Sequence, residues 1–202
     1  MNYSSVSDPH RADPAPGSWP RRAARARYRI AQFRSALQAQ VTPSELDMAR
    51  GILPAPAWAL FAAMPRPDQR HSLNVMLALQ AQGYRPPADR DLLAAALLHD
   101  AAKSGHLRLW HRVALVLLNL TPPGRRLLRW LARPAAPAHW RYSFYVIVHH
   151  AALGAAQVLA AGCSTTTAWL IEHHQAPLVT HAAARSQHDA WLLALQKADN
   201  ES

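Results

Sequence analysis

The sequence contains one cysteine, seven glycines and few acidic residues. A single cysteine, Cys163, excludes a framework of intramolecular disulfides and fits a reducing compartment. Glycine and β-branched residues are scarce and strand-like alternation is absent, which argues against a sheet. No run of 18 or more uncharged apolar residues is present, so we expect no membrane-spanning helix. Because the N-terminus also lacks the apolar segment of a secretion signal, we expect a cytoplasmic protein.

Alanine, leucine and arginine are the dominant residues of the chain. Hydrophobic residues make up 50% of the 202 positions, and the prevalence of Ala and Leu predicts an all-α protein. This length suits one domain with a sizeable core and a tail. The chain carries 22 Lys and Arg against 12 Asp and Glu, a formal net charge of +10. Such an excess favours anionic partners, either phosphorylated metabolites, nucleic acid or an anionic membrane surface.

The order of turn and cap residues divides the chain into segments. Residues 1–20 are rich in Pro and Ser and predict a flexible tail. Residues 21–65 are expected to form a basic helical extension, and 66–202 the main domain. "TPSEL" at 42–46 predicts a helix start with a capping box. Helices are expected over about 21–40, 55–64, 68–83, 88–103, 107–120, 143–161, 165–174 and 186–199.

The segment 121–142 ("TPPGRRLLRWLARPAAPAHWRY") mixes turn residues and arginines with two tryptophans, Trp130 and Trp140. We interpret it as a solvated basic face with both tryptophans packed beneath it. The alternative is that its arginines and tryptophans contact nucleic acid or an anionic membrane surface.

Histidine is frequent, with 12 residues, and most of them need no function. His188-Asp189 opens a helix in a polar stretch, so Asp189 is explained as a first-turn acid. A smaller set sits where an apolar helical stripe ends, on five different predicted helices. Imidazoles and carboxylates that enter one core from several helices favour a transition-metal site. The members of this set are His71, His99, Asp100, His150, His173 and Asp199.

The order of these residues resembles the HD superfamily of metal-dependent phosphohydrolases. The resemblance covers about residues 66–200, and "LLHDAAK" at 97–103, downstream of an "HS" helix, is its most specific part. It implies an HD-domain-like helical bundle. The motifs, in order, are "RHSLNV" (70–75), "AALLHDAAK" (95–103), "HHAALGAAQVL" (149–159), "LIEHHQAP" (170–177) and "LQKADN" (195–200).

The resemblance implies a set of metal ligands, carried over by position. The first metal would be held by His71, His99, Asp100 and Asp199. Asp100 would bridge to a second metal, which His150 and either His173 or His174 would complete. The cofactor would be one or two divalent ions, Mn, Fe, Zn, Co or Mg. Gln175 and Asn200 are candidates for hydrogen bonds to the ligands.

Lys103 follows His99-Asp100 by one helical turn and would lie over the same edge of the helix. There it could meet a phosphate oxygen of a substrate. The alternative role is that of a C-terminal lysine that complements the helix dipole, and the two roles are compatible.

The function that the resemblance implies is hydrolysis of a phosphoester, of a nucleotide or related phosphate, by a metal-activated water. A cyclic-dinucleotide esterase of the Gly-Tyr-Pro subclass is disfavoured, because "QAPLVT" follows His173-His174 in place of that signature. Two alternatives stay open. One is a mixed-valence di-iron oxygenase on the same scaffold, and the other is a regulatory HD module without catalysis. The oligomeric state is left open.

Overall fold

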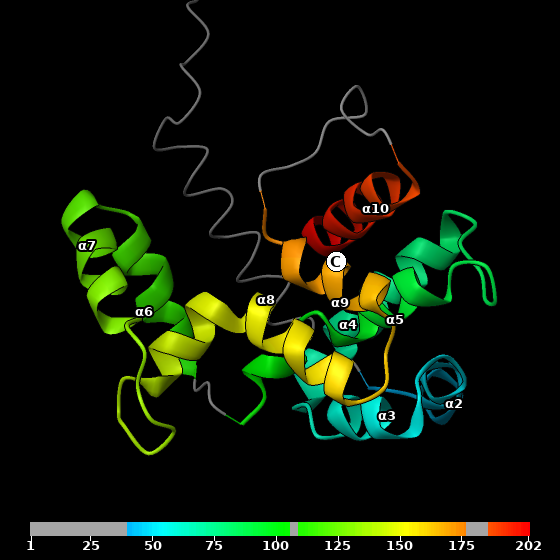
Figure 1. The fold of residues 1–202 in the computed structure, drawn as a ribbon, viewed down its shortest axis with the longest axis horizontal. Coiled ribbons are helices and arrows are strands. Elements are labelled where there is room, and N and C mark those ends of the chain that lie inside the picture. The colour runs from blue at the N-terminus through cyan, green and yellow to red at the C-terminus, as the bar shows by residue number, and fades with distance from the viewer. Residues whose placement is uncertain (1–39, 106–108, 177–185) are drawn as a thin grey trace, which may run out of the picture. The chain divides into compact units, whose positions relative to one another are not determined.

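The computed structural model describes residues 40–105, 109–176 and 186–202, which all belong to the unit Ala36–Ser202. These residues form nine α-helices and one short 3-10 helix, and no strand occurs among them (Figure 1). The all-α prediction is therefore confirmed. The tail expected at 1–20 and the basic helix expected at 21–40 fall on residues 1–39, outside the described part.

Helix α5 (Arg90–Leu98) lies at the centre of the core. Every residue from Leu92 to Leu98 is buried, as expected for a helix that is apolar on all sides. Its neighbours are α2 (Pro43–Ile52), α3 (Ala55–Ala62), α4 (Arg66–Ala81), α9 (Thr165–His173) and α10 (Gln187–Glu201).

The predicted helix starts are formed by side-chain caps. Thr42 and Glu45 make both hydrogen bonds of a capping box at the start of α2. Ser164 caps α9. Asp189 closes a second capping box at the start of α10, which confirms its assignment as a first-turn acid. Local chemistry thus fixes where these three helices begin.

Helices α2 and α3 belong to the same core as the helices that follow residue 66. Their buried residues include Ala49, Ile52 and Phe61. An ion pair also joins the two parts, because Arg70 Nη1 of α4 lies 2.7 Å from Glu45 Oε1 of α2. This pair ties α2 to the helix that carries His71.

The helix expected over 88–103 ends earlier, at Leu98. The N–H of His99 still donates to the carbonyl of Ala95, but Asp100 leaves the α-helical conformation with φ −105° and ψ 2°. A 3-10 helix, η1 (Ala101–Lys103), follows. Its bonds span three residues instead of four. His99 and Asp100 therefore occupy a break between two helical segments.

The segment 121–142 contains a helix, α7 (Pro122–Leu131), where we expected turn residues and a basic face. It packs against α6 (Leu109–Asn119), and its buried residues Leu128 and Leu131 cluster with Phe144. The expectation that both tryptophans pack beneath the arginines is wrong. Trp130 is 46% exposed and Trp140 is 63% exposed, because the two leucines occupy the packed side.

Helix α8 (Tyr142–Ala160) is long and apolar enough to cross a membrane, whereas we expected no segment of this kind. Among the described helices it is the one with sufficient length and apolar character, although polar residues such as His150 interrupt it. About 39% of this stretch is buried, and α8 packs against α9 and η1. Core helices of water-soluble proteins have the same composition, so this feature is weak support for a membrane span.

Candidate metal centre

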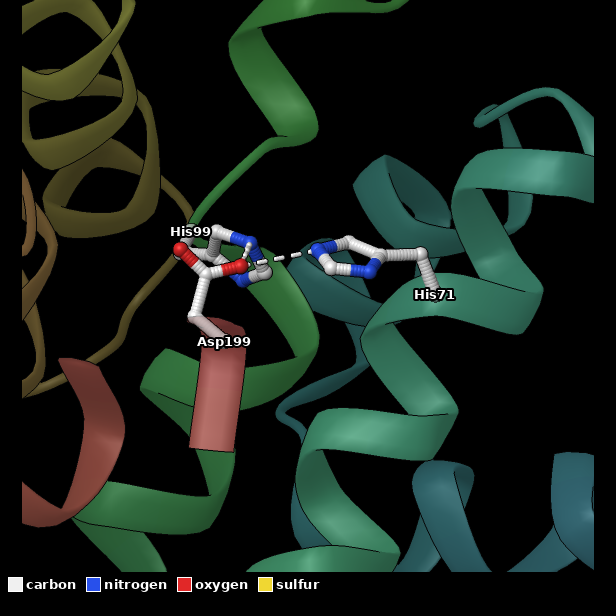
Figure 2. A group of neighbouring side chains, drawn as sticks. All are labelled: His71, His99 and Asp199. Carbon is white, nitrogen blue, oxygen red and sulfur yellow. Dashed lines mark hydrogen bonds and ion pairs between the residues drawn. The ribbon is translucent and has the colours of Figure 1, made fainter. Parts of the chain in front are cut away.

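A first group of potential ligands joins three helices. His71 extends from α4, His99 lies at the end of α5, and Asp199 comes from the last turns of α10 (Figure 2). Asp199 Oδ1 is 2.9 Å from His71 Nε2 and 3.4 Å from His99 Nε2. The carboxylate thus faces both imidazoles at once, and the three ligand atoms lie within 4.8 Å of one another.

A second group lies beside the first and consists of Asp100, His150 and His174. Asp100 Oδ1 is 3.5 Å from His150 Nε2 of α8. His174 follows the last residue of α9. Lys103 Nζ lies 2.7 Å from the same oxygen of Asp100, so this carboxylate is paired with an ammonium group as well.

The two groups are neighbours because His99 and Asp100 are adjacent in the chain but belong to different groups. His99 Nε2 is 3.8 Å from Asp100 Oδ1. The imidazole rings form a row, with centroids 5.3 Å apart for His71 and His99, 5.3 Å for His99 and His174, and 5.2 Å for His174 and His150. Two potential ion positions therefore flank the break at the end of α5.

Three of the histidines share one hydrogen-bonding pattern. The Nδ1 atoms of His99, His150 and His174 each lie within 3.0 Å of the backbone carbonyl three residues earlier. A carbonyl only accepts, so Nδ1–H must donate. This bond fixes the ring orientation and directs Nε2 into the site, which is how proteins usually prepare an imidazole to bind a metal.

Two of these nitrogens lack a hydrogen bond inside the protein. The Nε2 atoms of His99 and His150 are buried and have no hydrogen-bond partner among the described residues. Their nearest carboxylate oxygens stand 3.4 and 3.5 Å away, beyond the usual N–H···O distance. Buried polar atoms are rarely left without a partner. A cation between these atoms would satisfy both the nitrogens and the carboxylates.

The electrostatics of the site separate the histidines into two kinds. Burial opposes a charge on His99, but the carboxylates of Asp100 and Asp199 outweigh it and raise its pKa to about 9. Burial lowers the pKa of His150 to about 3 and that of His174 to about 4, with help from nearby cations.

The two carboxylates remain ionised although they are partly buried. Burial alone would raise both pKa values, but the Lys103 ammonium lowers the pKa of Asp100, and the imidazoles of His99 and His71 lower that of Asp199. Each group therefore offers one anionic oxygen and imidazole nitrogens. That donor set suits Zn, Mn, Fe or Co better than Mg, which prefers oxygen ligands. These buried groups could hold a metal ion.

The structure distinguishes the two candidates in "LIEHHQAP". His174 is buried and joins the second group, whereas His173 stacks on Trp169 with ring centroids 4.5 Å apart. His173 belongs to neither group. The other expected residues, His71, His99, Asp100, His150 and Asp199, are all brought together.

The residues expected to support the ligands differ from those that the structure places there. Gln175 is exposed, and Asn200 donates to the Gln196 carbonyl of its own helix. Gln196, which sequence analysis did not select, is buried and donates to the carbonyls of His173 and Ala176. It therefore holds the chain on both sides of His174. Its position on the same stripe of α10 as Asp199 is the feature of the sequence that could have identified it.

One side of the centre is open to solvent. The side chains of His99 and His150 are 1% exposed, whereas those of His71 and Asp199 are 27% and 29% exposed. A ligand would therefore approach over His71 and Asp199.

Comparison with models of protein families, with curated proteins and with solved structures gave no match.

Proposed function

We propose that the protein is a metal-dependent phosphohydrolase with an HD-type ligand arrangement. The observation that carries the proposal is the division of His99 and Asp100 between two adjacent groups, each with a carboxylate and imidazole nitrogens. Paired metal sites of this kind are typical of enzymes that hydrolyse phosphoesters. The residues also follow the order that the sequence resemblance implies, with His174 as the member of the pair His173 and His174 that joins the second group.

The residues would have distinct roles. His71, His99 and Asp199 would hold one ion, and Asp100, His150 and His174 a second. When bound, a divalent ion supplies Lewis-acid chemistry, in which it polarises a phosphoester and acidifies water. Asp100, between His99, His150 and Lys103, would contact both ion positions.

The position of Lys103 supports the proposal that the substrate is anionic. Its ammonium group lies 2.7 Å from Asp100 and is 17% exposed, so it places a fixed positive charge at the site. Such a charge stabilises the negative charge that develops on a phosphoryl group during hydrolysis. The substrate would be a nucleotide or a related phosphorylated metabolite, and the formal charge of +10 would favour its approach. We place this activity in the cytoplasm.

The test combines metal analysis with hydrolysis of a substrate panel. Protein purified without chelator is analysed for bound metals and then assayed against phosphomonoesters, phosphodiesters and nucleotides with Mn²⁺, Fe²⁺ or Mg²⁺. We expect bound transition metal and metal-dependent phosphate release. The variant Asp100→Asn should lower the activity by at least about a hundredfold, because it removes the anionic oxygen between both ion positions.

The matched control is Asp47→Asn, which removes an exposed carboxylate on α2 and should leave activity and metal content unchanged. Circular dichroism checks that both variants fold. Full activity of Asp100→Asn with unchanged bound metal would contradict the proposal. Oxygen consumption without phosphate release by the iron-loaded protein would indicate an oxygenase instead.

A further inference from the structure

A long part of the chain is free of acidic residues. No Asp or Glu occurs between Asp100 and Glu172, whereas the same stretch contains one lysine and seven arginines. It covers α6, α7 and α8, and four of the seven tryptophans lie in it. The basic residues are Lys103, Arg108, Arg112, Arg125, Arg126, Arg129, Arg133 and Arg141. Lys103 pairs with Asp100, but the seven arginines belong to a stretch with no acidic residue of its own, so this stretch carries a net positive charge.

Helix α6 is apolar on two opposite sides, and one of them is exposed. Ala114, Leu115 and Leu118 pack against Leu128, Leu131 and Phe144. The other side carries Trp110, Val113, Val116 and Leu117, followed by Leu120, which are 47–59% exposed. Positions 110, 113, 117 and 120 repeat at helical spacing, so they form one continuous apolar stripe.

Helix α7, which packs against α6, carries exposed positive charge and exposed apolar residues of its own. Arg125, Arg126 and Arg129 are exposed, and so are the apolar residues Leu127 and Trp130 of the same helix. The guanidinium of Arg141 lies over the Trp130 ring at 5.2 Å from its centroid. Large exposed apolar areas on soluble domains usually mark an interaction site. Tryptophan and arginine beside aliphatic residues are typical of helices that lie at a lipid–water interface.

We propose that the α6–α7 hairpin docks on the surface of a membrane that contains anionic phospholipids. The aliphatic stripe of α6 would enter the boundary between headgroups and acyl chains, and the arginines of α7 would contact lipid phosphates. Nucleic acid fits this surface less well, because the exposed stripe of α6 is mostly aliphatic. Val113, Val116, Leu117 and Leu120 offer bases neither hydrogen bonds nor the aromatic planes that Trp110 and Trp130 provide. The proposal is independent of the enzymatic activity, since the hairpin contributes no residue to either ligand group.

The test is sedimentation of the full-length protein with vesicles of phosphatidylcholine alone or mixed with phosphatidylglycerol. We expect binding to the mixed vesicles at low salt and much weaker binding to phosphatidylcholine. Each basic residue near an anionic surface strengthens partitioning about fivefold. The double variant Arg126→Gln/Arg129→Gln should therefore bind roughly 25-fold more weakly. Leu117→Ser should also reduce binding, including at high salt, because it removes an apolar contact.

Matched controls carry the same changes elsewhere on the surface. Arg85→Gln/Arg90→Gln removes two exposed arginines outside the hairpin, and Met48→Ser changes an apolar residue of α2 that is 40% exposed. Both should bind like the unchanged protein. Circular dichroism and metal content verify that every variant folds.

Three results would overturn the proposal. The first is absence of binding to mixed vesicles at low salt. The second is equal binding by the hairpin variants and the unchanged protein, which would assign the interaction to another segment. The third is that the unchanged protein binds no vesicles but self-associates or binds an oligonucleotide, and that Leu117→Ser loses this interaction. That result would identify a second copy or a nucleic acid as the occupant.

Discussion

His71 and Asp199 are separated by 128 positions in the sequence, and their side chains meet at 2.9 Å between Nε2 and Oδ1. The contact joins α4 to the last turns of α10, and both residues face His99 at the end of α5 (Figure 2). A residue near the C-terminus thus completes a group that begins in the first half of the chain. Formation of this group requires that the bundle is folded as a whole.

The two adjacent histidines of α9 should differ in their effect on metal binding. His174→Ala removes a buried imidazole of the second group and should lower metal affinity at least about tenfold. His173→Ala removes a ring that stacks on Trp169 outside both groups, so the metal content should stay the same. Elemental analysis after dialysis against a competing chelator measures the difference. Loss of metal in His173→Ala alone would reverse the assignment.

Metal binding should release a proton from His99. With a pKa of about 9, the metal-free His99 is protonated at neutral pH, and an ion on Nε2 must displace that proton. His150 and His174 are already neutral, because their pKa values lie at about 3 and about 4. Affinity should therefore rise about tenfold per pH unit from neutral pH up to about 9 and then level off.

Calorimetric titrations with a divalent metal in buffers of different ionisation enthalpy count the released protons. We expect about one proton per ion at the first group near pH 7.5 and none well above pH 9. An affinity that does not change across this interval would show that His99 is neutral before the metal binds.

Gly154 should tolerate a bulky side chain poorly. It lies one turn after His150 on α8, and a Cβ there would come within 3.2 Å of the Ile171 side chain and 3.7 Å of the Ala102 side chain. Gly154→Val should lower the free energy of unfolding by about 2 kcal/mol, because it overpacks the contact between α8 and its neighbours. The matched control is Gly51→Ala in α2, where a Cβ meets nothing within 4 Å.

Gly51→Ala should be neutral or stabilising by about 0.5 kcal/mol, since alanine favours the helix. Urea unfolding followed by circular dichroism compares the two variants. Equal free energies of unfolding for the two variants would mean that α8 can move away from Ile171 and Ala102 without a loss of stability.

The ion pair between Arg70 and Glu45 should contribute measurably to stability. Arg70 is 5% exposed, and Glu45→Gln would leave its guanidinium buried without an anionic partner. We expect a loss of about 2 kcal/mol in the free energy of unfolding. Asp47→Asn removes an exposed charge from the same helix and should change stability by less than about 0.5 kcal/mol. Similar losses in both variants would assign the effect to net charge.

Much of the fold followed from local patterns in the sequence. The caps at Thr42, Ser164 and Ser186 are formed as their residue types indicate, because a cap needs only its own side chain and a backbone N–H three residues away. The helix break after Leu98 did not follow, because alanine and leucine favour a continued helix. The exposed Trp130 was missed for a related reason, since Leu128 and Leu131 compete with it for the packed side of α7.

The sequence by itself determined that the chain forms helices and where most of them begin, and it indicated most of the histidines and aspartates that meet at the site. These properties depend on residue type and spacing along one helix. Tertiary structure alone decided that His174 and not His173 joins the site, that His99 and Asp100 belong to separate groups, and that Gln196 holds the end of α9. Neighbouring residues of a helix point about 100° apart, so only the packing of α9 against α5, α8 and α10 decides which one faces inward.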